Sequence, residues 1–370
     1  MLTFAIFLRI NFFMSMNLPP YRIFVGSQKT LGGKGIYSFH LDGNGKPLEL
    51  SLVFEMETPS FLVLHPTEKY LFALSKISAS EPTQGEILSF KVGHKLDLIN
   101  RHNTGGAGPC YISLSINAKS LFVANYYDGK VSSLPISTDG SLGKANAVLQ
   151  HEGSGPDSNR QAGPHAHSIK SDAAGNFALA CDLGADKIFI HPIEKETGRL
   201  LPSVAEGQAS QRGAGPRHFV FDSNNRHIYV ANELNSTVAV YSYHATKIEL
   251  LCIDSVSSIP QNFVEANTLS EIVLHPTEKW LYAGNRGLDS IAVFAIEAGG
   301  NKISLIAQVP CGGKIPRHFQ VDPTGKILLT ANQNSGNVGI FLIDLKTGIP
   351  KATGDSVSVP GASCIVYGRV

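Results

Sequence analysis

Short apolar runs separated by polar turns follow one another along nearly the whole chain. The stretch 215–243, GPRHFVFDSNNRHIYVANELNSTVAVYSY, contains three such runs. Within each run β-branched and aromatic residues alternate with other residues, and Asn, Asp, Ser and Gly fill the turns. This pattern predicts short antiparallel strands. Because the pattern recurs at 268–296 and 315–343, we interpret it as a structural repeat.

The repeat occurs six times with a fixed internal spacing, since the second apolar run always closes sixteen positions after the starting residue. The six pairs of starting and closing residues are Pro59 and Ser75, Pro109 and Asn125, Ala166 and Asp182, Pro216 and Asn232, Leu269 and Asn285, and Pro316 and Asn332. Successive starting residues are 47 to 57 positions apart, so length varies in the loops, which tolerate insertion. A third run follows each closing residue, and a fourth follows where the spacing leaves room. Four antiparallel strands per repeat of this length predict a propeller blade.

The two ends of the chain together supply a seventh blade. The C-terminal GASCIVYGRV resembles the first strand of a repeat, and the N-terminal YRIFVGSQ, GIYSFHLD and LELSLVFE resemble the second, third and fourth strands. We therefore predict an all-β fold, a seven-bladed β-propeller, as a single domain spanning residues 21–370. Its last strand pairs beside its first and leaves no open sheet edge in the ring. The alternative, an open β-solenoid, would need shorter repeats and dedicated caps.

Residues 1–20 lie outside the repeat and are mostly apolar. A signal peptide is one interpretation, but Arg9 lies inside the apolar run and no A-x-A-like cleavage site follows it. The run is also too short for an ordinary transmembrane helix. Because Met14 and Met16 directly precede the domain, we interpret the segment as a non-conserved or mis-assigned leader that is disordered or loosely packed.

The amino-acid composition argues against several classes of binding partner and of structural site. The chain has 31 Lys and Arg against 30 Asp and Glu, without a basic cluster, which argues against binding to nucleic acid or to an anionic membrane. Its five cysteines include no C-x-x-C pair, which argues against a disulfide framework or a zinc site and favours the reducing cytoplasm. We expect a monomer or a weak homo-oligomer.

Polar residues that break the repeat collect near one end of the strands. In a propeller blade the first strand is innermost, so its start and the end of the second strand lie on the same face, near the channel. The symmetry-breaking residues at these places are His167, Arg217, Glu233, Glu271, Arg286 and Arg317. A purely structural repeat would reuse one residue type at each position. Converging polar groups in a concave site are therefore expected at this mouth of the channel.

Structural roles compete with functional roles at several positions. The recurring asparagines Asn125, Asn232, Asn285 and Asn332 suit turn-closing hydrogen bonds. His65 and His275 occupy equivalent LHPTEK turns, and His218 and His318 recur within Pro-Arg-His-Phe, where blade packing is an alternative role. A buried guanidinium is costly without an anion, so Glu233 could instead be the partner of the arginines in a structural ion-pair ring.

The connection 151–168, HEGSGPDSNRQAGPHAHS, lies on the same face and carries Arg160, Gln161, His165 and His167. His-x-His on a strand directs both imidazoles to one side, which makes a metal pair conceivable. No third His or Cys ligand at suitable spacing supports it, so we predict no metal. Which of His165 and His167 faces the channel stays open at this point.

Recognised motifs for covalent or cofactor chemistry are missing from the sequence. There is no G-x-S-x-G elbow, no Walker loop, and no G-x-G-x-x-G between a strand and a helix. A carboxylate, imidazoles and several arginines remain, a set that suits acid–base chemistry on an anionic substrate. Arginines bind phosphate or carboxylate in bidentate fashion, and Glu233 or His167 would move a proton or activate water.

Several segments together resemble the propeller lactonase family, from about residue 21 to the C-terminus. These segments are GPHAHS (163–168), DLGADK (182–187), GPRHF (215–219), VANELNSTV (230–238), NRGLDSIAVF (285–294) and PRHFQVDPTG with ANQNSGNV (316–338). The family includes the bacterial 6-phosphogluconolactonases of propeller type and the fungal carboxy-muconate lactonizing enzymes.

The resemblance implies hydrolysis of 6-phospho-glucono-1,5-lactone to 6-phosphogluconate in the pentose phosphate pathway, without a cofactor. Similarity to the muconate-cyclising branch implies a catalytic set of His167, Arg217, Glu233 and Arg286. The substrate-binding residues expected beside it are Arg317, His165, Glu271, Gln333 and Arg160. Two alternatives stay open: a cycloisomerase or a lactonase for another lactone, such as a carboxy-muconate-type substrate, and a non-catalytic propeller that binds a peptide or protein.

Overall fold

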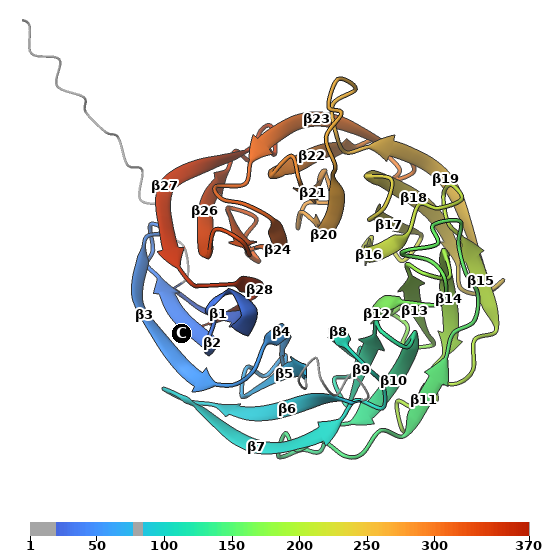
Figure 1. Cartoon of the computed structure of the whole chain (residues 1–370), viewed down its shortest axis with the longest axis horizontal. Helices are drawn as coiled ribbons and strands as arrows, with labels where there is room; N and C mark the ends of the chain where they lie inside the picture. The colour runs from blue at the N-terminus through green and yellow to red at the C-terminus, as the bar shows by residue number, and fades with distance from the viewer. Residues whose placement is uncertain (1–19, 77–83, 370) are drawn as a thin grey trace, which may run out of the picture.

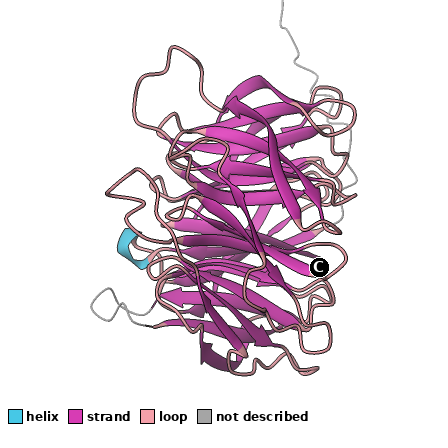
Figure 2. Cartoon of the chain, turned by 90° about the vertical axis from the view of Figure 1, so that its right-hand side faces the viewer, coloured by secondary structure: helices cyan, strands magenta, loops and turns pink. Residues whose placement is uncertain are grey.

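Seven four-stranded antiparallel sheets surround a central axis (Figure 1) in the computed structural model, which describes residues 20–76 and 84–369. The all-β, seven-bladed propeller that the repeat predicts is confirmed. Within the described residues the one helical element is the 3₁₀ turn η1 (Lys29–Leu31), and no helix there has the length and apolarity of a membrane span. Figure 2 shows the strands running between two faces made of loops. The predicted leader lies outside the described residues, apart from Pro20.

Each blade begins with an innermost strand that pairs with a second strand. The innermost strands are β4 (Pro59–Leu64), β8 (Pro109–Leu114), β12 (Ala166–Ser171), β16 (Pro216–Phe221), β20 (Thr268–Leu274), β24 (Pro316–Val321) and β28 (Ala362–Arg369). Their partners are β5 (Tyr70–Lys76), β9 (Ser120–Asn125), β13 (Phe177–Asp182), β17 (His227–Asn232), β21 (Trp280–Arg286), β25 (Ile327–Asn332) and β1 (Tyr21–Ser27). In β9, β17 and β25 every residue is buried. Each second strand packs between two neighbouring blades, which explains its nearly continuous apolar sequence.

Two outer strands complete each blade. The third strands are β2 (Gly35–Leu41), β6 (Gly85–Val92), β10 (Lys130–Pro135), β14 (Lys187–Pro192), β18 (Thr237–His244), β22 (Ser290–Ile296) and β26 (Asn337–Ile343). The fourth strands are β3 (Pro47–Glu55), β7 (Leu96–Asn103), β11 (Ala147–Gln150), β15 (Ala205–Gln208), β19 (Glu249–Ser257), β23 (Ile303–Pro310) and β27 (Pro350–Ser358). The fourth strands are the exposed rim, as the largely exposed β27 shows.

The two ends of the chain close the ring. β28 is the innermost strand of the seventh sheet and pairs antiparallel with β1, from Tyr21 opposite Arg369 to Ser27 opposite Ala362. This confirms the predicted pairing of the last strand beside the first. A side-chain contact reinforces the closure, because Tyr21 Oη donates a hydrogen bond to Asp322 Oδ2 in the adjacent blade at 3.0 Å.

Replacing Tyr21 with phenylalanine is expected to lower the free energy of unfolding by about 1 kcal/mol, the typical net contribution of one hydrogen bond. Asp322 keeps its bonds from the backbone N–H groups of Thr324 and Lys326, so no buried charge is left unpaired. Urea unfolding followed by circular dichroism measures the difference. Tyr37→Phe is the matched control, since the Tyr37 hydroxyl accepts a hydrogen bond from the backbone N–H of Lys34 at the exposed surface. Equal losses in both variants would contradict a specific role for the interblade bond.

A β-bulge interrupts the innermost strand of all six repeats just after the starting residue. In β16, Pro216 pairs with Asn232 and His218 pairs with Ala231, which leaves Arg217 as the extra residue. Bulges of this kind locally break strand alternation and re-aim side chains. As a result Arg217 and His218, although adjacent, both contact the neighbouring strand β20 near the channel.

Candidate active site

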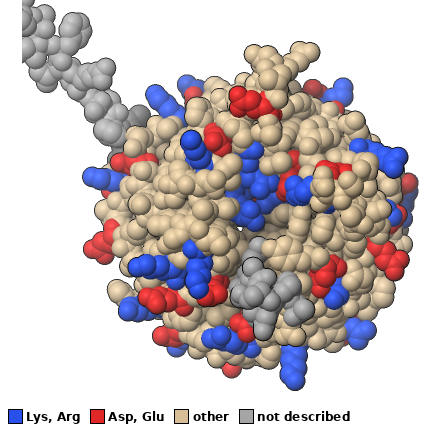
Figure 3. All heavy atoms as spheres, viewed as in Figure 1, with Lys and Arg blue, Asp and Glu red and all other residues tan. Residues whose placement is uncertain are grey.

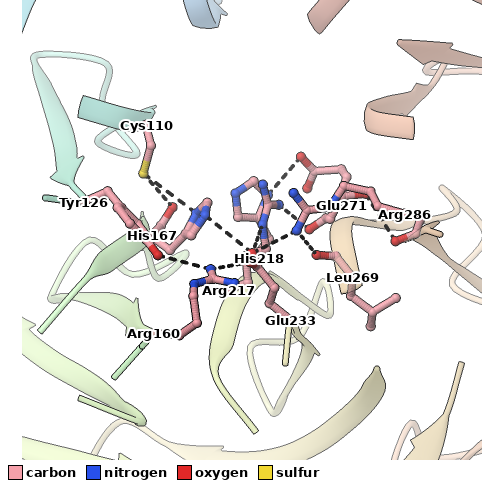
Figure 4. Close-up of polar contacts among 12 residues, drawn as sticks. Cys110, Tyr126, Arg160, His167, Arg217, His218, Glu233, Leu269, Glu271 and Arg286 are labelled. Carbon is pink, nitrogen blue, oxygen red and sulfur yellow. Dashed lines mark hydrogen bonds and ion pairs between the residues drawn. The ribbon is translucent and has the colours of Figure 1, made fainter. Parts of the chain in front are cut away.

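The carboxylate of Glu233 lies at the centre of three guanidinium groups (Figure 4). Its Oε2 is 2.8 Å from Arg217 Nε and 3.0 Å from Arg286 Nη2, and its Oε1 is 2.6 Å from Arg160 Nη2. We call Arg160, Arg217, Arg286 and Glu233 the arginine cluster. The arginines come from the loop before β12, the bulge of β16 and the end of β21. The backbone N–H of Glu233, bonded to Gly215 O at 2.8 Å, holds the carboxylate just past the end of β17.

The charges in this cluster do not balance. Three guanidinium groups face one carboxylate that is only 4% exposed, so two positive charges stay uncompensated. Burial raises the pKa of Glu233, but the charges of Arg286 and Arg217 and the hydrogen bond from Arg160 lower it more, to well below its usual range. Glu233 is therefore ionised at neutral pH and is a poor proton acceptor.

Arg317 adds a fourth guanidinium beside the cluster. It is the extra residue in the bulge of β24. Burial lowers its pKa, and the positive charge of nearby Arg286 lowers it further. Across the described residues no ion pair joins Arg317 to a carboxylate. Figure 3 shows Lys and Arg side chains gathered in the hollow at the centre of the ring. A concave site with surplus positive charge favours an anionic ligand.

His167 is the extra residue in the bulge of β12 and reaches the same carboxylate. Its Nε2 is 3.8 Å from Glu233 Oε2, and its Nδ1 is 3.7 Å from Cys110 Sγ. Burial lowers the pKa of His167 well below its usual value, and the positive charge of Arg217 adds to this effect. The imidazole is therefore neutral at neutral pH, the form that takes part in proton transfer or donates a hydrogen bond.

His165 lies just before β12 and contacts Tyr126 instead of Glu233. Its ring stacks on the Tyr126 ring at 4.6 Å, and its Nδ1 is 2.7 Å from Tyr126 O. Tyr126 Oη in turn accepts a hydrogen bond from Arg160 Nη2 at 3.1 Å. The question of which histidine faces the cluster is thus answered in favour of His167. In the part of the chain that the structure describes, no three His, Cys, Asp or Glu side chains are grouped to hold a metal ion.

Glu271 and Gln333 lie apart from the arginine cluster. Glu271 Oε2 is 3.0 Å from His218 Nδ1 and 3.4 Å from His318 Nε2, within the channel. Gln333 follows the end of β25, and its buried Oε1 has no hydrogen-bond partner among the described residues. Of the nine candidates, the structure joins His167, Arg160, Arg217, Glu233 and Arg286 directly, and places Arg317 and His165 beside them.

The recurring asparagines and histidines of the repeat were assigned structural roles from the sequence, and the structure agrees for some of them and not for others. Asn285 Nδ2 bonds to Ser258 O at 3.0 Å, and His275 Nδ1 lies 2.8 Å from Thr277 Oγ1, as expected for turn-closing residues. His218 makes a hydrogen bond to Glu271 in the channel and His318 Nε2 lies 3.4 Å from the same carboxylate, contacts that blade packing alone does not require. Tyr126 also contacts the candidate site, through Arg160 and His165. The signal in the sequence that could have identified it is its position directly after a closing residue, the same position that Glu233 has in its own repeat.

The chain is similar to known proteins over nearly its whole length. A family model described as "Lactonase, 7-bladed beta-propeller" matches residues 22–367. The 6-phosphogluconolactonase of Bacillus subtilis is 32% identical over 348 residues, which cover 93% of this chain and 97% of that protein. The 6-phosphogluconolactonase of Formosa agariphila is 33% identical over 353 residues, with 93% and 98% covered. Among solved structures, the periplasmic gluconolactonase of Pseudomonas aeruginosa gives a TM-score of 0.87 at 28% identity, covering 94% of this chain and 99% of that one.

Proposed function

The chain belongs to the lactonase family of seven-bladed β-propellers, and we propose that the lactone it hydrolyses is 6-phospho-glucono-1,5-lactone. The observation that carries this proposal is the surplus positive charge of the arginine cluster, enlarged by Arg317. A phosphate group is the anion that several guanidinium groups bind best, because each can offer paired N–H donors. The two relatives named 6-phosphogluconolactonase support the same substrate. A place in the pentose phosphate pathway and a cytoplasmic location complete the proposal.

The geometry suggests a different role in the reaction for each charged side chain. Arg160 and Arg317 retain some solvent exposure and would bind the phosphate. Arg286 would polarise the lactone carbonyl and stabilise the oxyanion formed when water attacks it. Arg217 is almost fully buried and would hold Glu233 in place from below. Since Glu233 is too acidic to accept a proton, a neutral imidazole takes the proton of the attacking water. His167 is the imidazole that the sequence suggests.

A direct assay tests the proposal. The purified full chain is mixed with freshly made 6-phospho-glucono-1,5-lactone, and the spontaneous rate of hydrolysis is subtracted. We expect kcat/KM to exceed that for glucono-1,5-lactone by at least about tenfold, since a charge-assisted contact contributes roughly 1.5–3 kcal/mol. Equal rates with both lactones would contradict the phosphate assignment. A preference for a carboxy-muconate-type lactone would support the alternative substrate.

Replacing Arg317 with methionine is expected to raise KM for the phosphorylated lactone by roughly 10–100-fold, because one charge-assisted contact to phosphate is lost. Hydrolysis of glucono-1,5-lactone should stay within about threefold, since that substrate lacks the phosphate. Lys314→Met, which removes an exposed cation from the same segment, is the matched control. A loss of equal size for both lactones would show that Arg317 does not bind the phosphate.

A further inference from the structure

The bulges place a second layer of side chains in the channel, below the arginine cluster. This middle layer consists of Phe61, Tyr111, Ser168, His218, Glu271, His318 and Cys364, and all of them are buried. In the six repeats they lie two positions after the starting residue, and Cys364 lies two positions after Ala362, the first residue of β28. Aromatic contacts cross the channel: the Phe61 ring is 5.4 Å from the His318 ring and 6.1 Å from the His218 ring. Side chains from separate blades therefore meet at the axis.

Glu271 fixes the protonation pattern of the two histidines in this layer. The backbone N–H of Ile365 donates to His318 Nδ1 at 3.3 Å, so His318 carries its proton on Nε2, which faces Glu271. His218 Nδ1 lies 3.0 Å from the same carboxylate oxygen and therefore carries the proton of that ring. The lone pair of His218 is left on Nε2. A carboxylate that holds Nδ1–H while Nε2 stays free is the arrangement of an oriented general base.

The second ring nitrogen of His218 is the one that does not face Glu271. His218 Nε2 is buried without a hydrogen bond among the described residues. An unsatisfied buried polar atom is uncommon in native proteins, and a water or substrate atom would satisfy it. His218 directly follows Arg217, and its ring lies 5.2 Å from the ring of His167 (Figure 4). The unpaired acceptor is therefore adjacent to the arginine cluster.

His167 has the opposite pattern. Its Nε2 faces Glu233 at 3.8 Å, so a proton on Nε2 is favoured and the nitrogen acts as a donor. Burial, reinforced by the charge of Arg217, lowers the pKa of His218 well below its usual value, which keeps its Nε2 free to accept. The site thus holds one imidazole suited to donate a hydrogen bond and another suited to take a proton.

We propose that His218, oriented by Glu271, is the base of the reaction, and that His167 instead donates Nε2–H to the oxyanion. The proposal rests on the lactone hydrolysis proposed above. Water forms a bond to the carbonyl carbon and transfers one proton to His218 Nε2, while the carbonyl electron pair moves to the oxygen. The intermediate collapses, the bond to the ring oxygen breaks, and that oxygen takes the proton from His218. Glu271 stabilises the imidazolium between these steps and is a positioning residue.

Kinetics of the full chain, with the lactone that the wild type hydrolyses best, test this assignment. His218→Asn is expected to lower kcat by roughly 10²–10⁴-fold, the usual cost of losing a general base, with KM within about threefold. Retention of more than about a third of kcat would overturn the proposal. His275→Asn is the matched control, an equally buried histidine outside the site that bonds Thr277 and Gly325 O, and it should keep the wild-type kcat.

The Glu271→Gln variant distinguishes a role of Glu271 in orienting His218 from a merely structural role. Removing the carboxylate charge makes the imidazole less basic, so the acid limb of the kcat–pH profile should move to lower pH while kcat falls. A merely structural role of Glu271 would lower kcat without moving that limb, and this result would overturn the assignment even if His218→Asn failed to fold. If the wild type hydrolysed none of the lactones, the proposed function would fail first and this assignment would fail with it. An active wild type with unaffected variants contradicts only the assignment of His218.

Discussion

Replacing Glu233 with glutamine is expected to lower the free energy of unfolding by about 3–5 kcal/mol, the range for breaking a buried ion pair by removing one partner. Glutamine keeps the shape of the side chain but removes the negative charge that Arg160, Arg217 and Arg286 share. The three guanidinium groups then repel one another without compensation and lose their orientation. Lactone hydrolysis should fall by at least about 10²-fold, since the groups that stabilise the oxyanion are no longer held in place.

The pH dependence of stability provides an internal check. The pKa of Glu233 in the folded protein lies below its value in the unfolded chain, which is about 4.3 for an ordinary glutamate. The carboxylate therefore stabilises the fold at pH values above the unfolded pKa, and this stabilisation is lost as the pH falls through the folded pKa. Urea unfolding should show the full difference between wild type and Glu233→Gln at pH 7 and a smaller difference below about pH 4.

An added anion offers a matched control for the same variant. Sulfate or 6-phosphogluconate should raise the unfolding temperature of Glu233→Gln more than that of the wild type, because the anion can occupy the place of the lost carboxylate. Potassium chloride at equal ionic strength should not do so. A stability difference that is constant from pH 7 to pH 3, together with no specific effect of sulfate, would contradict the role of Glu233 as the central anion of the cluster.

Replacing Arg286 with alanine is expected to lower kcat by roughly 10²–10³-fold, the cost of removing one donor to a developing oxyanion. Arg286 contacts Glu233 and keeps 15% of its side chain accessible, and the more exposed Arg160 is the one proposed to bind the phosphate. Its loss leaves Glu233 paired with Arg160 and Arg217, so unfolding should be affected less than in Glu233→Gln. Steady-state kinetics and urea unfolding of the two variants measure both quantities.

Arg286→Lys distinguishes charge from geometry at this position. Lysine keeps the positive charge but lacks the planar fork of N–H donors. We expect its kcat to lie between those of the alanine variant and the wild type. If Arg286→Ala retained kcat within about threefold, Arg286 would not stabilise the oxyanion, and the role would pass to another donor of the site.

The sequence determined the architecture because the properties that set it are local. The alternation of apolar and polar residues defines each strand, and the hairpin turns set the register of the first two strands. In the turn after β16, for example, Asp222 Oδ1 accepts from the backbone N–H groups of Arg226 and His227. The fixed spacing of sixteen residues follows from such turns and reveals six blades. The leftover strands at 21–55 and 361–370 then required the closure that β1 and β28 make.

The sequence also predicted most residues of the candidate site, since charged residues at inner positions of a repeat stand out against the other repeats. The arginine cluster, however, depends on contacts between distant segments, such as Arg160 and Glu233, which are 73 positions apart. The low pKa of Glu233 and the neutral state of His167 follow from burial and from surrounding charge, which only the closed ring establishes. The β-bulges in the innermost strands contribute to the site as much as these long-range contacts do. Strict alternation would separate Arg217 from His218, and only the tertiary structure shows that both of them reach into the channel, where His218 meets Glu271.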